Sequence, residues 1–207
     1  MAPPQSYLDV TGRSKFSRFV NLTDSERSWH PEFSYFGANV YAYLLARYSD
    51  VFDLISLQLY ESYSRAMEAV AVGNVRPSAY LYDYMDQLAS SQYWVSFSDD
   101  PTLSMEDQYV VVPISKLVLG LGNGWALRRP DRTFFADLEE VQDAWIRLQE
   151  HGIGPRGFMF WTIDEEGTNN VSFSKGLRHI VDSEDSVRRG TTTTGIEEWE
   201  LESRIME

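Results

Sequence analysis

The chain has 207 residues, of which 43% are hydrophobic, and its formal net charge is -13. This composition is typical of a folded globular protein, and an acidic chain without a basic stripe predicts no nucleic-acid partner. The absence of cysteine excludes a disulfide framework and any thiolate metal site, and no apolar run reaches the roughly 20 residues that a membrane span needs.

The first predicted element is the end of a buried strand at Met1, Ala2 and Pro3. A helix is expected over residues 38–48, and it leads into residues 51–60, a short apolar run rich in branched side chains. Such a run is typical of a strand in a parallel sheet that is covered on both faces.

Two later apolar runs, residues 116–121 and 157–163, predict further strands of the same sheet. Between them, residues 137–150 carry apolar side chains at helical spacing, with Asp137 and Glu140 as the expected capping pair. Strand, helix and strand in this order form a βαβ unit with a right-handed crossover. Repeated units give either an open doubly wound sheet or a (β/α)8 barrel.

The glycines at residues 119–124 raise the question of a dinucleotide site. Their order, L-G-L-G-N-G, lacks the G-x-G-x-x-G spacing, and Trp125 follows where a helix should start. We therefore expect no cofactor here.

The connections differ in length and composition. Residues 84–113 are too long for a simple connection and predict an elaborated βα loop over the mouth of a site. From residue 182 the apolar periodicity stops. We expect one domain over residues 1–181, followed by an acidic, disordered tail over residues 182–207.

Side chains at the carboxyl ends of the predicted strands are the first candidates for a site, because parallel strands present these ends to a substrate. Tyr60 ends one strand with a hydroxyl that needs a hydrogen-bond partner, and Trp161 ends another with an indole face that fits the apolar face of a sugar ring. Gln58 and Glu61 flank Tyr60. The alternative for both rings is an ordinary place in the core.

Other chemistry has weaker support in the sequence. Asp164, Glu165 and Glu166 follow Trp161, and three adjacent acids usually form a solvated or helix-capping cluster. A pair of carboxyl groups that flanks a glycosidic bond cannot be placed from this spacing. The three histidines lie far apart without metal-binding spacing, so we expect no metal site.

Together, the four strand motifs resemble those of glycoside hydrolase family 18, the chitinases. The similar segments, in chain order, are residues 1–7 for the fifth barrel strand of that family, 52–61 for the sixth, 116–124 for the seventh and 157–161 for the eighth. The resemblance extends to about residue 181. It implies an α/β fold in which strands five to eight, with their helices, form part of a (β/α)8 TIM barrel.

The resemblance also implies an activity, the hydrolysis of β-linked N-acetylglucosamine polymers by a substrate-assisted retaining mechanism. By resemblance, Tyr60 holds the acetamido oxygen of the substrate for attack on the anomeric carbon and is the supporting catalytic residue. Gln58 and Glu61 line the same subsite, and Trp161 forms its floor. Glu61 stands where the family usually has Asp or Asn.

The D-x-x-D-x-D-x-E motif, which supplies the general acid of the family on strand four, is absent from the sequence. The expected protein is therefore a fragment that is inactive alone and binds chitin or N-acetylglucosamine oligosaccharides, with an amino-terminal half-barrel as a further partner.

One alternative is a non-catalytic carbohydrate-binding module that uses Tyr60, Trp161, Trp94 and Trp125 as a platform. Another is an α/β remnant without a ligand. No signal-peptide pattern opens the sequence, and the compartment stays open.

Overall fold

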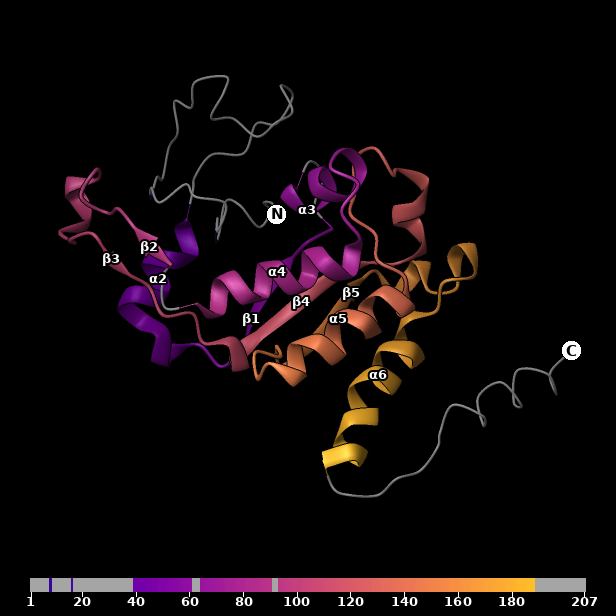
Figure 1. Cartoon of the computed structure of the whole chain (residues 1–207). Helices are drawn as coiled ribbons and strands as arrows, with labels where there is room; N and C mark the ends of the chain where they lie inside the picture. The colour runs from indigo at the N-terminus through magenta and orange to yellow at the C-terminus, as the bar shows by residue number, and fades with distance from the viewer. Residues whose placement is uncertain (1–7, 9–15, 17–38, 61–63, 91–92, 189–207) are drawn as a thin grey trace, which may run out of the picture.

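The protein is a mixed α/β structure around a three-stranded parallel sheet with the strand order β1-β4-β5 (Figure 1). The computed structural model describes residues 8, 16, 39–60, 64–90 and 93–188, with residues 184–188 as backbone only. Parallel strands joined through helices confirm the predicted α/β class. The predicted strand end at residues 1–3 lies outside the described residues.

Each strand of the sheet coincides, to within one residue, with part of an apolar run that the sequence predicts to be extended. The strands are β1 (Ile55–Gln58), β4 (Leu117–Gly122) and β5 (Gly157–Trp161). β4 is central, because it pairs in parallel with β1 on one side and with β5 on the other. Every residue of β4 is accordingly buried.

Helices connect these strands. The longer ones are α2 (Val40–Tyr48), α4 (Pro77–Ala89), α5 (Leu138–Glu150) and α6 (Phe173–Arg188). Single turns are α3 (Arg65–Met67), the π-helical η2 (Glu68–Val72) and the 3₁₀ turns η1 (Ser49–Val51), η3 (Pro101–Leu103), η4 (Ile114–Lys116), η5 (Gly124–Arg128), η6 (Ile163–Glu165) and η7 (Thr168–Asn170).

Two of the longer helices agree with the sequence, since α2 and α5 match the helices expected over residues 38–48 and 137–150. α6 continues past residue 181, where the tail was expected to begin, and residues 189–207 lie outside the described part of the chain. Among the described helices, none has the length and apolar character to cross a membrane.

α5 begins at the predicted cap, because the Asp137 carboxylate accepts a hydrogen bond from the Glu140 backbone N–H at 2.9 Å. Glu140 makes different bonds from those expected of a capping partner. Its carboxylate accepts from Arg76 Nη2 at 3.0 Å and from the Ser78 backbone N–H at 2.8 Å. One carboxylate on α5 therefore ties this helix to the start of α4.

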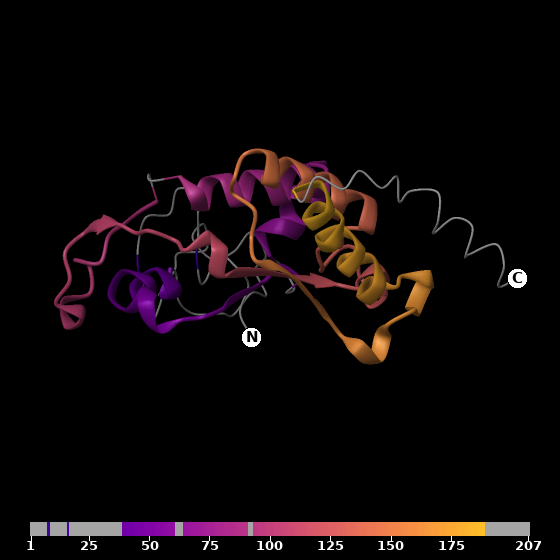
Figure 2. The same ribbon diagram turned by 90° about the horizontal axis from the view of Figure 1, so that it is seen from below.

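The sheet has two different faces. Because paired residues of parallel strands share a face, Leu57, Leu119 and Phe158 lie on one side. α5 and α6 pack on this side, where Trp145 contacts Phe158 with 5.3 Å between ring centroids and Phe173 contacts Phe160 at 6.1 Å. Figure 2 shows α4, α5 and α6 together on this side of the sheet.

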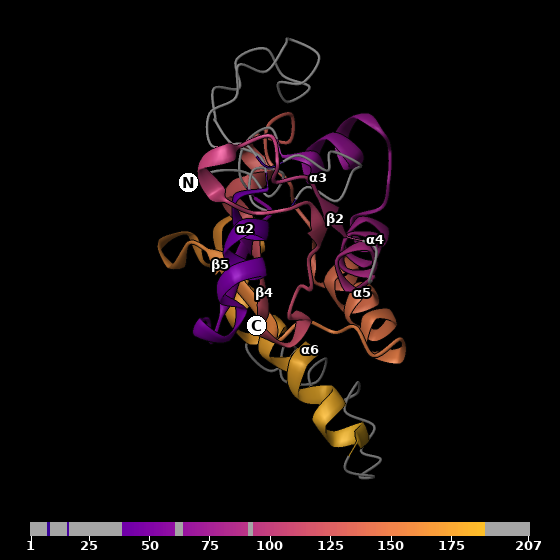
Figure 3. The same ribbon diagram turned by 90° about the vertical axis from the view of Figure 1, so that its left-hand side faces the viewer.

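The opposite face carries mostly small and polar residues, together with Val118, Met159 and Trp161. Its residues are Ser56 and Gln58 from β1, Val118, Gly120 and Gly122 from β4, and Gly157, Met159 and Trp161 from β5. In Figure 3, α4 and α5 lie side by side, and α2 stands apart from them. Among the described helices, α4, α5 and α6 thus cover one and the same face of the sheet.

The segment at 84–113 differs from the predicted loop over the mouth. Its first part completes α4, and the rest forms a hairpin of β2 (Trp94–Val95) and β3 (Gln108–Tyr109) that leads through η4 into β4. A segment that leads into a parallel strand lies at the amino edge of the sheet, as Figure 1 shows. The hairpin and Trp94 therefore lie at the edge opposite the carboxyl ends of the strands.

Candidate functional site

Three aromatic rings meet at the carboxyl ends of the strands. Tyr60 follows β1, Trp161 ends β5, and Trp125 lies in the turn η5 after β4. The rings of Tyr60 and Trp161 are nearly parallel, at 19°, with 6.4 Å between their centroids. Trp125 meets Tyr60 edge-on, with 6.3 Å between centroids. The two rings singled out from the sequence are therefore neighbours.

The three rings differ in exposure. Tyr60 is buried, with 3% of its surface exposed, whereas Trp161 is 45% exposed. A large indole that stays almost half exposed at a strand end offers a flat apolar surface to a ligand, and the buried phenol supports it from one side. Trp125 is partly buried.

Glycines in β4 make room for Tyr60. A Cβ atom on Gly120 would lie 3.2 Å from Tyr60 Cε1, and one on Gly122 would lie 3.2 Å from Tyr60 Cβ. Both distances are shorter than ordinary van der Waals contact. The glycine run that lacks the dinucleotide spacing thus has a packing role, because it lets the phenol ring lie close against the central strand.

Gln58 contributes an unusual polar atom. Its Oε1 is buried and has no hydrogen-bond partner within the described part of the chain. Gln58 pairs with Gly120, which in turn pairs with Met159, so its side chain emerges on the face that carries Ser56 and Met159. A buried acceptor without a partner is costly, and a ligand N–H or O–H donor in this place would satisfy it.

The turns after β4 and β5 are joined by hydrogen bonds. Asn123 Nδ2 donates to the Thr162 carbonyl oxygen at 2.9 Å, and the Thr162 backbone N–H donates to Asn123 Oδ1 at 3.3 Å. The Trp161 carbonyl oxygen accepts from the Asn123 backbone N–H at 3.2 Å and from Trp125 Nε1. The Trp161–Thr162 peptide bond is cis.

The acidic residues after Trp161 have structural partners. Glu165 pairs with Arg128 at 2.6 Å and accepts from Thr168 Oγ1 at 2.8 Å, and these bonds, that of Arg128 above all, lower the pKa of Glu165. Burial raises the pKa of Glu166, but hydrogen bonds from Ser174 and its neighbours outweigh burial and lower it overall. Neither carboxyl group has the raised pKa of a general acid.

Glu166 also caps the start of α6, since its Oε1 accepts from the Ser174 backbone N–H at 2.7 Å and from Ser172 Oγ at 3.1 Å. The expectation that these acids cap a helix or form a solvated cluster is confirmed for Glu166. Asp164 is exposed.

The remaining sequence candidates fall elsewhere. Glu61 lies outside the described residues. Trp94, the other proposed member of an aromatic platform, is at the opposite edge of the sheet, in β2. Trp125 does join the site. Across residues 39–60, 64–90 and 93–188, no group of three His, Asp or Glu side chains is arranged to hold a metal ion.

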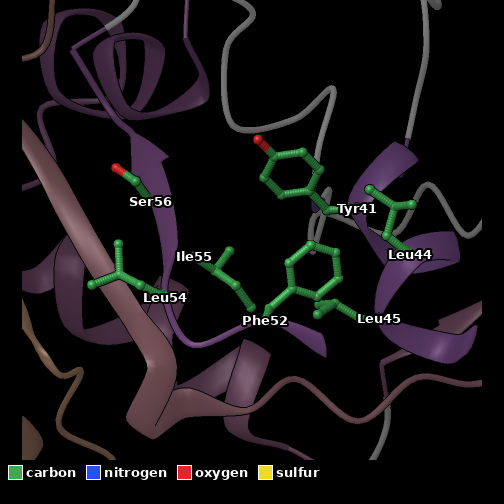
Figure 4. Close-up of a pocket in the computed structure, with 7 residues that line it drawn as sticks. All are labelled: Tyr41, Leu44, Leu45, Phe52, Leu54, Ile55 and Ser56. Atoms are coloured by element: carbon green, nitrogen blue, oxygen red, sulfur yellow. The ribbon is translucent and has the colours of Figure 1, made fainter. Parts of the chain in front are cut away.

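Two cavities lie at the outer edges of the sheet. One, of about 230 Å³, lies between α2 and β1 and is lined mainly by apolar side chains such as Leu45, Phe52 and Ile55 (Figure 4). The other, of about 530 Å³, lies between β5 and α6, next to Phe158 and Leu177. Neither lining includes Tyr60 or Trp161. The described sheet thus ends on both sides next to unfilled space.

Comparison with models of known protein families finds no match, and comparison with curated proteins finds none either.

Proposed function

We propose that the carboxyl edge of the sheet is a chitinase-like binding site for N-acetylglucosamine polymers. The observation that carries the proposal is the near-parallel pair of Tyr60 and Trp161, in which the indole is almost half exposed. Gln58 adds a buried acceptor that suits an N–H or O–H donor of a sugar. Trp161 forms the floor of the sugar site, and Tyr60 lies beside it.

The finer architecture that we propose is one side of a (β/α)8 barrel. Three features support it: a parallel sheet with α4, α5 and α6 on one face, mostly small residues on the other face, and cavities beside both outer strands. In this proposal the small-residue face is the barrel interior. By the resemblance, the fifth strand, predicted over residues 1–7, would lie next to β1, and strands of an amino-terminal half-barrel would fill the edge next to β5 and close the barrel.

The proposed reaction is the substrate-assisted hydrolysis of the β-linkage, with Tyr60 holding the acetamido oxygen of the substrate. In this scheme the N-acetyl oxygen attacks the anomeric carbon, and a carboxylic acid protonates the leaving oxygen. The D-x-x-D-x-D-x-E motif that provides this acid is absent from the 207 residues. General-acid catalysis contributes about 10² to 10⁴ in rate, so we expect this chain alone to bind without measurable cleavage.

The same observation favours a second function, carbohydrate binding without catalysis. Glu165 and Glu166, the carboxylates nearest to Trp161 in sequence after Asp164, are committed to Arg128 and to the start of α6. The two functions differ in one result. A chitinase-like site gains hydrolysis of a fluorogenic N-acetylglucosamine oligomer when strands bearing the acid motif are supplied, and a binding module does not.

Binding itself is tested by isothermal titration calorimetry of the full chain with chitotetraose, and with cellotetraose to measure the contribution of the acetamido groups. We expect chitotetraose to bind more tightly than cellotetraose. Trp161→Ala should weaken chitotetraose binding at least about tenfold, because stacking on the sugar is lost.

Trp94→Ala is the matched control, because Trp94 is also an exposed tryptophan, at 38%, but lies in the hairpin at the opposite edge. It should leave the affinity unchanged. Equal affinities in the two variants, or no binding of chitotetraose to the wild-type chain, would contradict the proposal.

A further inference from the structure

We propose that Asn123 is a positioning residue for the sugar site, which it serves by fixing the backbone that carries the Trp161 indole. The expected effect on sugar binding rests on the proposed function, whereas the effect of Asn123 on the orientation of the indole can be measured in the ligand-free protein. Asn123 follows β4 and has no exposed surface. Its side chain therefore does not contact a ligand directly but acts through its neighbours.

The amide of Asn123 meets Thr162 with both of its polar atoms. Nδ2 donates to the Thr162 carbonyl oxygen at 2.9 Å, and Oδ1 accepts from the Thr162 backbone N–H at 3.3 Å. The backbone N–H of Asn123 also donates to the Trp161 carbonyl oxygen at 3.2 Å. Three hydrogen bonds from one residue thus hold the main chain directly after the indole.

Asparagine is suited to this place, because its amide is both donor and acceptor on a short side chain. An aspartate at 123 would still accept from the Thr162 N–H, but when ionised it has no hydrogen to donate to the carbonyl oxygen. The Thr162 carbonyl oxygen also accepts from the Glu165 backbone N–H at 3.0 Å. In Asn123→Asp, a carboxylate oxygen would replace the donor that faces this carbonyl oxygen, and the two acceptors would repel each other.

The orientation of the indole depends on such hydrogen bonds because the side chain is not held by burial. Trp161 is 45% exposed and ends β5, whose one described partner strand is β4. Its ring has Tyr60 beside it, with 6.4 Å between the two ring centroids. The course of the main chain after β5 orients the indole relative to Tyr60, and Asn123 holds that main chain together with the bond from Trp125 Nε1 to the Trp161 carbonyl oxygen.

The test uses the full chain labelled with fluorinated tryptophan, and the fluorine NMR signal of Trp161 is assigned through Trp161→Phe. In Asn123→Ala we expect the Trp161 signal to move or broaden in the absence of ligand, because the indole samples other orientations. Chitotetraose affinity should fall about tenfold. Asn123→Asp, which keeps the acceptor and loses the donor, should give the same changes in a variant of nearly unchanged shape.

Thr133→Val is the matched control for lost buried hydrogen bonds. Thr133 is 4% exposed, and its Oγ1 contacts the carbonyl oxygens of Ala126 and Arg129 at 2.9 and 2.7 Å, on the same turn after β4. This variant should lose stability while the Trp161 signal and the affinity stay at their wild-type values.

The inference is overturned if the Trp161 signal in Asn123→Ala and Asn123→Asp has the same position as in Thr133→Val. It is also overturned if Thr133→Val moves that signal as much as they do. A wild-type chain that does not bind chitotetraose refutes the proposed function, and the ligand-free signal still decides the role of Asn123.

Discussion

Gly122 gives Tyr60 the space to lie against the central strand. A Cβ atom at this position would lie 2.9 Å from Ala126 Cβ and 3.2 Å from Tyr60 Cβ. We predict that Gly122→Ala lowers the free energy of unfolding by about 1–3 kcal/mol, as overpacking of a dense core does. It should also weaken chitotetraose binding, because Tyr60 has to move. Urea unfolding and calorimetry measure the two effects.

Gly152→Ala is the control for this substitution. Gly152 has a φ of +68°, and nothing lies within 4 Å of an added Cβ. The change should therefore cost about 1 kcal/mol through backbone strain alone, without an effect on binding. A Gly122→Ala protein with wild-type stability and affinity would show that the phenol does not depend on this space.

At the residue scale, the sequence predicts the neighbours Tyr60 and Trp161 because both close apolar runs whose carboxyl ends must share an edge. It does not predict the role of Asn123, whose partner Thr162 is 39 positions away. A hydrogen bond of that separation leaves no local pattern. The sequence suggests Trp125 only as part of an alternative platform, and its edge-on contact with Tyr60 depends on the turn that follows Asn123.

At the scale of elements, Glu140 couples α4 to α5. Its carboxylate accepts from Arg76 and from the Ser78 N–H, and its side chain is 19% exposed. We predict that Glu140→Gln lowers the free energy of unfolding by about 1–2 kcal/mol at neutral pH, because bonds to a charged group are lost. Arg178→Ala is the control, since its pair with Asp182 is exposed and should contribute little.

The same residue predicts a pH dependence. Burial raises the pKa of Glu140, but the hydrogen bonds of Ser78 and Arg76 outweigh it and leave the pKa below the ordinary value of 4.5. A pKa that is lower in the folded state gives stability that is complete above the unfolded pKa and is lost as the pH falls through the folded one. Thermal unfolding from pH 7 downward should show a smaller loss in Glu140→Gln than in the wild type. An equal loss in both proteins would rule this contribution out.

The sequence predicts helices and strands well where a single hydrophobic pattern, either a continuous apolar run or helical spacing, extends over the whole segment. The apolar runs give β1, β4 and β5, and the helical spacing with the Asp137 cap gives α5. The prediction for 84–113 is wrong, because it ignores the helix that Pro77 begins at its first position. Once α4 is recognised, the segment that follows must return to the amino edge of the sheet.

At the scale of the whole molecule, the two outer strands explain both the barrel proposal and a predicted liability. Leu54 lies at the cavity beside β1 and is 53% exposed. Within the described residues β1 is an outer strand of the sheet, and apolar side chains at an unpaired sheet edge favour association. We predict self-association that rises with protein concentration and is reduced by Leu54→Lys, measured by size-exclusion chromatography with light scattering.

Leu127→Lys is the control, because Leu127 is 42% exposed but lies in η5, away from the sheet edge. It should associate like the wild type. The prediction is contradicted if the chain is monomeric at all concentrations. It is also contradicted if the two substitutions change self-association equally, because the edge beside β1 would then not mediate it.

The central claim is that the Trp161 indole lies against a bound N-acetylglucosamine chain. The direct measurement is a titration of the full chain with chitotetraose, followed through the indole N–H cross peaks in nitrogen–proton NMR spectra, with Trp161 and Trp94 assigned by substitution. The account predicts a saturable shift of the Trp161 peak and a stationary Trp94 peak. A Trp161 peak that stays in place while the sugar is in excess would contradict it.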